Sequence, residues 1–319
     1  TGMGNNWLYT SNWISAPVQG ADGTLYMVEE ANDGTGLSYL VQLNQDGTLK
    51  GKALIDMTLR FNAVPPVITE EGNLVLVGES QVVAMTTSGA KLWHFTPDSG
   101  DRLLNQSAAL GDQGVVYVSA TNTTMQRLVL YAIKDGQKVW RHVSNMYSGS
   151  SSNFLGHTQT APSVLDDGTI LFGRGIINQS GQRIVTFDSS ANMFRGQPIM
   201  GYDGRVTMTV SDSLNSPTGQ WISFDRQTGE VLASTVIDAP VPAGHAVDFM
   251  GQSYIGTESG QLMVLNQSGQ VVWSLAVNSM LVGAPIIDCT GQSYWVLASG
   301  EVLKVNTTGQ IIDRFTGDG

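Results

Sequence analysis

Short apolar runs alternate with polar, glycine-containing turns along the whole chain. The pattern repeats roughly every 40 residues, and such a period is the signature of a repeat architecture. In the last two copies the same residues recur, as Gly-Gln-Ser-Tyr at residues 251–254 and again at 291–294. Each copy contains several runs of strand length separated by turns, which predicts a series of antiparallel strands joined by hairpins.

A turn glycine marks each of seven copies: Gly23, Gly72, Gly114, Gly168, Gly204, Gly251 and Gly291. Glycine suits hairpin turns because it adopts positive φ without steric cost. An apolar run follows each glycine, as in Leu74–Val77, and a second turn glycine follows later in the copy. In the fourth copy we assign no second glycine and place Ser190-Ala191-Asn192 at that position. The pattern predicts four strands per copy.

A short strand is expected before each first turn, often opened by proline, which is tolerated at a strand's first residue. Many runs are apolar without alternation, which favours sheets buried on both faces. Stacked sheets of this kind form a propeller. We therefore predict an all-β, single-domain, seven-bladed β-propeller of four-stranded antiparallel blades over residues 1–319. An eight-bladed alternative has one blade truncated at the N-terminus, because residues 6–9, around Trp7, resemble one more fourth strand. The predicted copies span approximately residues 11–56, 57–99, 100–146, 157–195, 196–238, 239–278 and 279–316.

Several last strands carry a tryptophan, as at Trp93, Trp140 and Trp273, and we expect these indoles to fill the gaps between blades. The order Ala-Pro, Asp-Gly-Thr-Leu-Tyr, Leu-Asn, Gly, Trp resembles the PQQ-like β-propeller repeat. That repeat occurs in quinoprotein dehydrogenases and in BamB-like non-catalytic scaffolds of the periplasm. The resemblance covers nearly the whole chain and implies a fold rather than an activity.

The net charge of −11 and the pI of about 4.6 argue against nucleic acid and anionic membranes as partners. No stretch has the roughly 18 apolar residues of a transmembrane helix. The chain starts at Thr1 without an initiator Met, so we expect an upstream segment to have been removed and leave open a membrane tether there. Its Ser-, Thr-, Asn- and Gln-rich composition favours a periplasmic, cell-surface or secreted protein.

No catalytic or metal-binding motif stands out in the sequence. The single cysteine, Cys289, is expected to be a small buried hydrophobe. PQQ with calcium is disfavoured as a cofactor. Many dehydrogenases of the family that this chain resembles use a ring formed by two adjacent cysteines, and one cysteine cannot form that ring. His94, His142, His157 and His245 form no close pair, and we expect His245 to be a satisfied core residue or to line a central channel. We therefore predict no cofactor, no metal and no catalytic residues.

The loop from 144 to 160 is longer than most connections, and loops of more than about 12–15 residues are commonly functional. Its contact candidates are Tyr147, Phe154, His157 and Gln159. Equivalent segments of other copies supply Trp13, Arg60, Phe61, Asn62, Asn105, Arg195 and Met280. We expect these side chains to converge on one face and to bind a protein or peptide, with plugging of the channel as the equal alternative. The predicted function is a non-catalytic exported scaffold; the alternative is a quinoprotein-like enzyme or a small-molecule receptor.

Overall fold

The computed structural model describes residues 13–30, 37–55, 64–104, 106–147, 161–187, 193–194, 196–211, 216–241 and 244–316. These residues divide between two compact units, the first carrying strands β1–β16 and the second β18–β31. Almost all the regular structure in this part of the chain is β-strand, the exception being one 3₁₀ turn at Asp112–Gly114.

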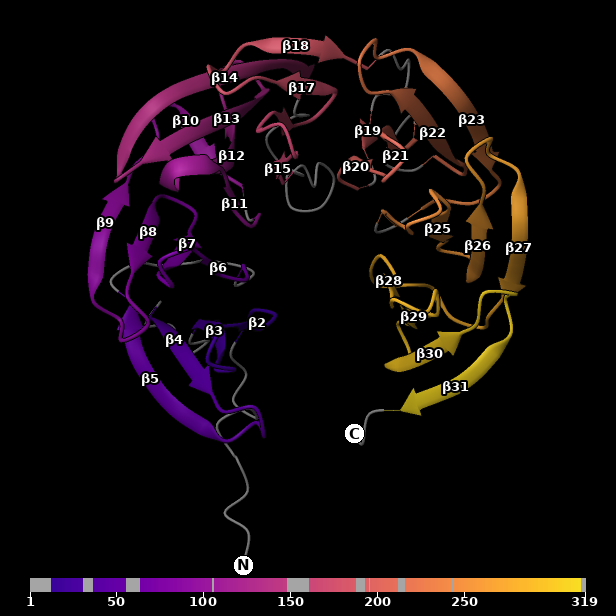
Figure 1. Cartoon of the computed structure of the whole chain (residues 1–319), viewed down its shortest axis with the longest axis horizontal. Helices are drawn as coiled ribbons and strands as arrows, with labels where there is room; N and C mark the ends of the chain where they lie inside the picture. Colours follow the sequence, from indigo (N-terminus) through magenta and orange to yellow (C-terminus); the bar gives the residue numbers. More distant parts are fainter. Residues whose placement is uncertain are drawn as a thin grey trace, which may run out of the picture. The chain divides into compact units, whose positions relative to one another are not determined.

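The first unit contains three complete antiparallel sheets (Figure 1). Their strands are β1 (Trp13–Ile14), β2 (Val18–Gln19), β3 (Leu25–Glu30), β4 (Ser38–Leu43) and β5 (Leu49–Ile55); β6 (Val67–Ile68), β7 (Leu74–Val77), β8 (Val82–Met85) and β9 (Lys91–Phe95); and β10 (Asp101–Leu103), β11 (Ala109–Leu110), β12 (Val116–Asn122), β13 (Arg127–Lys134) and β14 (Gln137–Tyr147). A fourth sheet has the order β15 (Ser163–Val164), β16 (Ile170–Leu171), β17 (Gly175–Ile177) and β18 (Arg183–Thr186).

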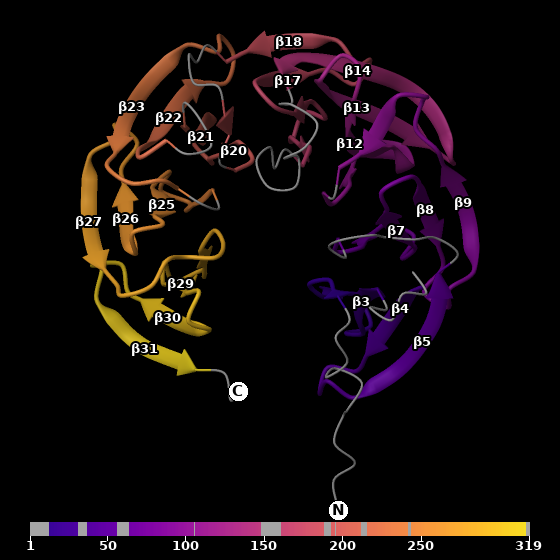
Figure 2. The ribbon, with the colours of Figure 1, turned by 180° about the vertical axis from the view of Figure 1, so that it is seen from behind.

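The second unit contains three further sheets (Figure 2). Their strands are β19 (Met193–Phe194), β20 (Ile199–Met200), β21 (Arg205–Ser211), β22 (Gly219–Asp225) and β23 (Val231–Ile237); β24 (His245–Val247), β25 (Ser253–Gly256), β26 (Gln261–Leu265) and β27 (Val271–Ala276); and β28 (Ile286–Ile287), β29 (Ser293–Val296), β30 (Glu301–Val305) and β31 (Ile311–Thr316).

Within every sheet the strands follow one another in chain order, each antiparallel to the next. The first strand is interrupted in three sheets, where β1 and β2, β10 and β11, and β19 and β20 pair with the same neighbour. Each therefore counts as one strand in two pieces, and the four-strand repeat predicted from the sequence is confirmed.

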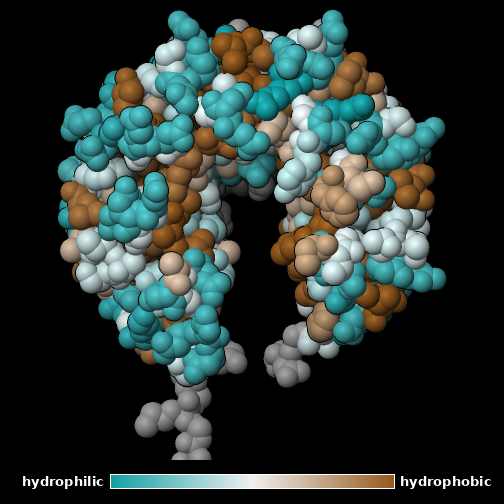
Figure 3. Space-filling view, viewed as in Figure 1, coloured by the Kyte–Doolittle hydropathy of each residue, from teal (hydrophilic) through white to brown (hydrophobic). Residues whose placement is uncertain are grey.

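The core consists of apolar layers between successive sheets. One layer joins residues of the second and third sheets, among them Val75 and Val118, and another joins the sixth and seventh, among them Leu262 and Trp295. Every residue of β7, β8 and β12 is buried, so the prediction of two buried faces holds for the middle strands. The last strands alternate between exposed and half-buried positions instead, as β9 and β27 do. Isolated hydrophobic side chains therefore appear among hydrophilic ones along the outer edge of each unit (Figure 3).

The strand tryptophans lie between sheets, as predicted. The Trp140 Nε1 donates a hydrogen bond of 2.7 Å to the Gln179 carbonyl of the next sheet. The second-turn glycine of the following sheet packs on the indole: an added Cβ would meet Trp140 at 2.8 Å from Gly181, and Trp273 at 2.9 Å from Gly309. These turns therefore require glycine for two reasons, positive φ and the closeness of the neighbouring sheet.

Two predictions about turns are wrong. The fourth copy does have a second turn, at residues 178–181, where the Asn178 Oδ1 accepts hydrogen bonds from the backbone N–H groups of Ser180 and Gln182. Cys289 is exposed, not buried. The apolar run before it ends at Ile287, and Asp288 opens a turn that places Cys289 at its tip. The N-terminal strand expected around Trp7 lies outside the described residues.

Candidate functional site

The loop face is the side of the sheets that carries the connections from one sheet to the next. One described part of it is the connection between β27 and β28, residues 277–285. Three backbone hydrogen bonds hold this connection in place: Val277 N–H to the Gly260 carbonyl at 2.7 Å, Ala298 N–H to the Met280 carbonyl at 2.9 Å, and Val282 N–H to the Val296 carbonyl at 3.2 Å. Met280 and Val282 are thus held in an extended, strand-like segment beside the seventh sheet.

Side chains alternate along this segment. Leu281 is 1% exposed and packs into the core of the sixth and seventh sheets, whereas Met280 and Val282 are 42% and 55% exposed. Leu281 occupies the space that a Cβ on Gly256 would need, which explains the glycine at the end of β25. Because Leu281 anchors the segment, its two apolar neighbours face solvent.

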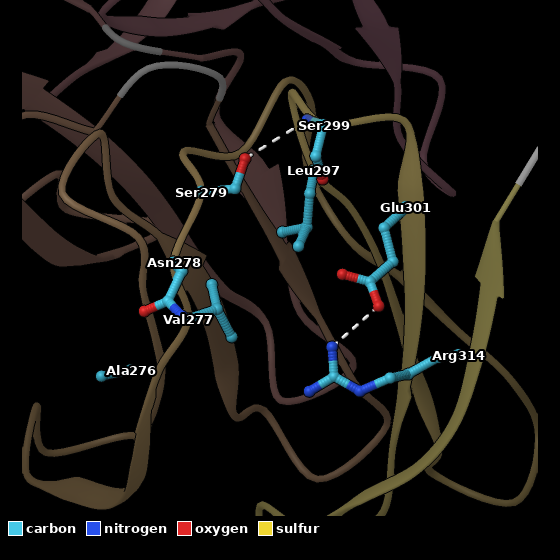
Figure 4. Close-up of a pocket in the computed structure, with 8 residues that line it drawn as sticks. All are labelled: Ala276, Val277, Asn278, Ser279, Leu297, Ser299, Glu301 and Arg314. Atoms are coloured by element: carbon cyan, nitrogen blue, oxygen red, sulfur yellow. Dashed lines mark hydrogen bonds and ion pairs between the residues drawn. The ribbon is translucent and has the colours of Figure 1, made fainter.

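A pocket of about 290 Å³ adjoins this segment (Figure 4). It is lined by Ala276, Val277, Asn278, Ser279, Leu297, Ser299, Glu301 and Arg314. Glu301 of β30 and Arg314 of β31 lie across the pocket from Asn278, and their ion pair measures 2.7 Å. The Ser299 N–H donates to the Ser279 Oγ at 3.3 Å.

This lining can bind both polar and charged groups. The ion pair uses one nitrogen of the Arg314 guanidinium, which has five N–H donors in all, and the Asn278 amide adds donors and an acceptor. Val277 and the buried Leu297 supply an apolar part of the wall. The arrangement suits a short polypeptide segment, which carries amide, charged and apolar groups together.

Of the predicted site residues, only Met280 has a described side chain, and it is exposed as a contact residue should be. Trp13 lies in β1 and Tyr147 ends β14. Outside the described residues are Arg60, Phe61, Asn62, Asn105, Phe154, His157, Gln159 and Arg195. Their convergence on one face therefore stays a prediction.

The sequence analysis missed the pocket residues Asn278, Glu301 and Arg314. A basic residue in the last strand is not diagnostic, because Lys52 and Arg141 occupy the equivalent register positions. The equivalent residues of the fifth and sixth sheets are Ser234 and Ser274, so the position varies between copies and does not by itself single out Arg314.

A buried ion pair in the third sheet is structural in character. The Arg141 Nε and Nη2 donate to Asp101 at 2.7 and 2.9 Å, and Asn122 and Tyr131 donate to the same carboxylate. Burial alone would raise the pKa of Asp101, but these hydrogen bonds outweigh it and hold the pKa below its usual value. Both oxygens of the fully buried Asp101 carboxylate are used inside this network, so they are not available to a substrate.

His245 is buried, and its Nε2 lies 2.7 Å from the Thr207 Oγ1. The expected burial is confirmed, but the expectation that this core histidine is satisfied is wrong, because its Nδ1 has no hydrogen-bond partner among the described residues. Burial lowers the pKa of His245 to about 4. Within the described residues, no three His, Cys, Asp or Glu side chains are grouped so that they could hold a metal ion.

The family profile described as "Outer membrane protein assembly factor BamB" matches residues 12–192 and 217–312. The chain belongs to the BamB family. Its fold is similar to that of BamB from Moraxella catarrhalis, with a TM-score of 0.65, 17% identity and coverage of 96% of this chain and 88% of that one. No curated protein sequence matches the chain.

Two other solved structures share the BamB-like fold. The Dos1 propeller aligns with a TM-score of 0.67 at 11% identity, over 96% of this chain and 85% of that one. A streptogramin B lyase aligns with a TM-score of 0.53 at 13% identity, over 90% of each chain. With seven antiparallel sheets, these likenesses confirm a seven-bladed β-propeller. The described residues include no helix with the length and apolarity of a membrane span.

Proposed function

We propose that this BamB-family propeller is a non-catalytic scaffold that binds a protein or peptide segment on its loop face. The observation that carries the proposal is the pair of exposed apolar side chains, Met280 and Val282, held rigidly beside a polar pocket that contains Arg314. Methionine and arginine are enriched at protein interfaces, and interface anchors work best on preorganised backbone.

The size and lining of the pocket support a peptide over a cofactor. Its volume of about 290 Å³ lies just below the about 300–1,000 Å³ that is typical of small-molecule sites, and such sites are mostly apolar. Five of its eight lining residues are polar or charged: Asn278, Ser279, Ser299, Glu301 and Arg314. A pocket of this kind suits one side chain of a longer segment, whose remaining residues would cross Met280 and Val282.

The family profile is described as an outer membrane protein assembly factor, which supports an extracytoplasmic location for this chain as well. Membership in that family also favours a protein partner. The similarity to a streptogramin B lyase keeps an enzyme or small-molecule receptor as the second candidate, because propellers of this shape serve both purposes.

The test is a pull-down from cell-envelope extract of the source organism with the wild-type protein and a Met280→Asp/Val282→Asp double variant. The two introduced charges should reduce the amount of each specific partner captured by at least about tenfold, because charged residues are unfavourable in interface cores. The matched control is Val272→Asp, a residue 47% exposed on the outer strand β27, which should retain them. A second variant, Arg60→Ala/Phe61→Ala/His157→Ala, tests the remaining predicted contact residues. If the double variant and the triple variant both captured the same partners as the wild type, binding on the loop face would be contradicted.

The alternative is tested spectroscopically. A quinoprotein-like enzyme would bind added PQQ in a calcium-dependent way, would show the absorbance of the bound quinone, and would reduce a dye. We expect none of these signals. Saturable quinone binding with dye reduction would replace the scaffold proposal with an enzyme.

A further inference from the structure

The first turns of the seven sheets differ in kind between the two units. The two residues before each turn glycine are acidic or polar in most of the first four turns, which carry Asp22, Glu70, Glu71, Asp112, Asp166 and Asp167. In the fifth and sixth turns the corresponding residues include Tyr202, Phe249 and Met250. Equivalent positions of a repeat protein face the same local constraints, so this departure is a property of these turns and not of the fold.

These three side chains are exposed on the surface. Tyr202 is 88% exposed, Phe249 61% and Met250 59%. The turns do not require them, since Gly204 and Gly251 supply the positive φ and the Asp203 and Asp248 carboxylates accept the turn N–H bonds. The exposed rings of Tyr202 and Phe249 present apolar faces on which a ligand can stack.

A groove of about 390 Å³ lies at the same turns, lined by Arg205, Met250, Gln252, Asn266, Gln267 and Ser268. Two interactions hold Arg205 in place. Its Nη1 donates a hydrogen bond of 3.0 Å to the Gln267 carbonyl, and its Nε forms an ion pair of 3.4 Å with the Asp203 carboxylate. The Gln267 amide nitrogen donates to the Met250 carbonyl at 3.0 Å. The groove wall is therefore a preorganised set of polar groups, not a collection of loose side chains.

Some hydrogen-bonding capacity in this wall is unused. Asn266 and Ser268 are satisfied by the turn itself. The Gln252 side-chain amide and the Gln267 Oε1 have no hydrogen-bond partner among the described residues, and Arg205 keeps further N–H donors. Planar amides and a guanidinium offer donors and acceptors in directions set by their geometry, and the Asp203 carboxylate beside the groove is paired with Arg205.

We infer that these turns form a binding site for a neutral oligosaccharide. A pyranose ring has one apolar C–H face, which stacks on an exposed aromatic ring, and a rim of hydroxyls, each both donor and acceptor. Tyr202 and Phe249 do not line the groove itself but belong to the same turns as Arg205 and Met250, and in this proposal they supply the stacking surface. Arg205, Gln252 and Gln267 of the groove bind the hydroxyls. In a chain of net charge −11, an uncharged ligand meets no long-range repulsion.

A protein partner fits this surface less well. A stable protein interface buries about 800 Å² per partner around a contiguous apolar centre. Here the apolar side chains are single residues on successive turns, separated by polar ones, which gives isolated stacking platforms. The site also lies at the opposite ends of the strands from residues 277–282, because first turns and inter-sheet connections alternate along antiparallel strands.

The test is titration of the full chain with two defined neutral probes, maltotriose and triacetylchitotriose, followed by saturation-transfer NMR and calorimetry. We expect saturable binding of at least one, weakened about tenfold or more in Tyr202→Ala/Phe249→Ala, which corresponds to about 1.4 kcal/mol. Phe249→Tyr keeps an aromatic ring and should retain binding. Phe315→Ala removes an aromatic side chain that is 46% exposed on β31 and should also retain it.

The inference is overturned if neither trisaccharide binds, or if the double variant binds as the wild type does. It is likewise overturned if the wild type binds a fluorescent uncharged peptide through Tyr202 and Phe249 but neither sugar, since the site would then be a peptide site. Thermal melting of each variant shows that the fold is intact, so a loss of binding reports on the site itself.

Discussion

At the scale of single residues, the unusual group is His245, a buried imidazole. One nitrogen is hydrogen-bonded to Thr207, and the other has no partner among the described residues. Desolvation disfavours its charged form, and the pKa falls from 6.5 to about 4. Within the fold the residue therefore behaves as a neutral polar spacer between the fifth and sixth sheets. Its proton affinity has a direct consequence for stability.

Between about pH 6.5 and 4 the unfolded chain binds a proton at His245 that the folded chain does not. The stability contributed by the neutral residue is complete above pH 6.5 and is lost as the pH falls toward 4. We expect this loss in the free energy of unfolding to be about 3 kcal/mol. Urea denaturation at a series of pH values, for wild type and His245→Gln, measures it as the difference between the two profiles. Parallel profiles would mean that the imidazole is not desolvated.

At the scale of elements, the hairpin turns bear two kinds of constraint, and the fifth sheet separates them. Gly204 and Gly229 have φ values of +76° and +77°. An added Cβ at Gly204 would meet nothing within 4 Å, whereas at Gly229 it would collide with the Thr186 carbonyl oxygen of the neighbouring sheet. The first turn is thus fixed by backbone conformation alone, and the second by conformation and inter-sheet contact.

We therefore expect Gly204→Ala to lower the free energy of unfolding by about 1–2 kcal/mol, the cost of a left-handed residue that carries a Cβ. Gly229→Ala should cost more, by about 1–3 kcal/mol, because the sheets must move apart. Chemical denaturation of the two variants, made in the same sheet with the same substitution, measures the difference. Equal losses would show that the second turn yields without disturbing its neighbour.

At the scale of the whole molecule, the two proposed sites lie at opposite ends of the strands of the second unit. The proposed protein site uses Met280, Val282 and the pocket at Arg314, and the proposed sugar site uses Tyr202 and Phe249 at the turns. The two sets share no residue and no hydrogen bond among the described residues. Distant sites of this kind usually contribute independently.

Combining Met280→Asp/Val282→Asp with Tyr202→Ala/Phe249→Ala should therefore reproduce each loss unchanged: partner capture falls as in the first variant, and sugar affinity as in the second. Calorimetry and pull-down on the combined variant, with both double variants as references, measure this. If the loop-face substitutions changed the sugar affinity, the two ends would be coupled. The coupling free energy would then be −RT ln α, where α is the ratio of the sugar affinities with and without those substitutions.

The local features of this fold could be predicted from the sequence because they depend on neighbouring residues. Glycines such as Gly204 mark turns through their own φ, and apolar runs such as Leu74–Val77 mark strands buried on both faces. The repeat then determines the number of sheets and the family resemblance. The aromatic residues Tyr202 and Phe249 can also be read from the sequence, but only comparison of the turns between copies shows that they are unusual.

Tertiary structure alone decided which residues meet. His245 pairs with Thr207 38 positions away, Arg314 with Glu301 across a strand pair, and Gly229 abuts Thr186 of another sheet. Cys289 is exposed because the strand ends at Ile287 and the Asp288 hydrogen bonds start the turn there, which places Cys289 inside the turn. The contacts of His245 and Gly229 depend on the distance and register between sheets, which packing sets and which no local pattern encodes.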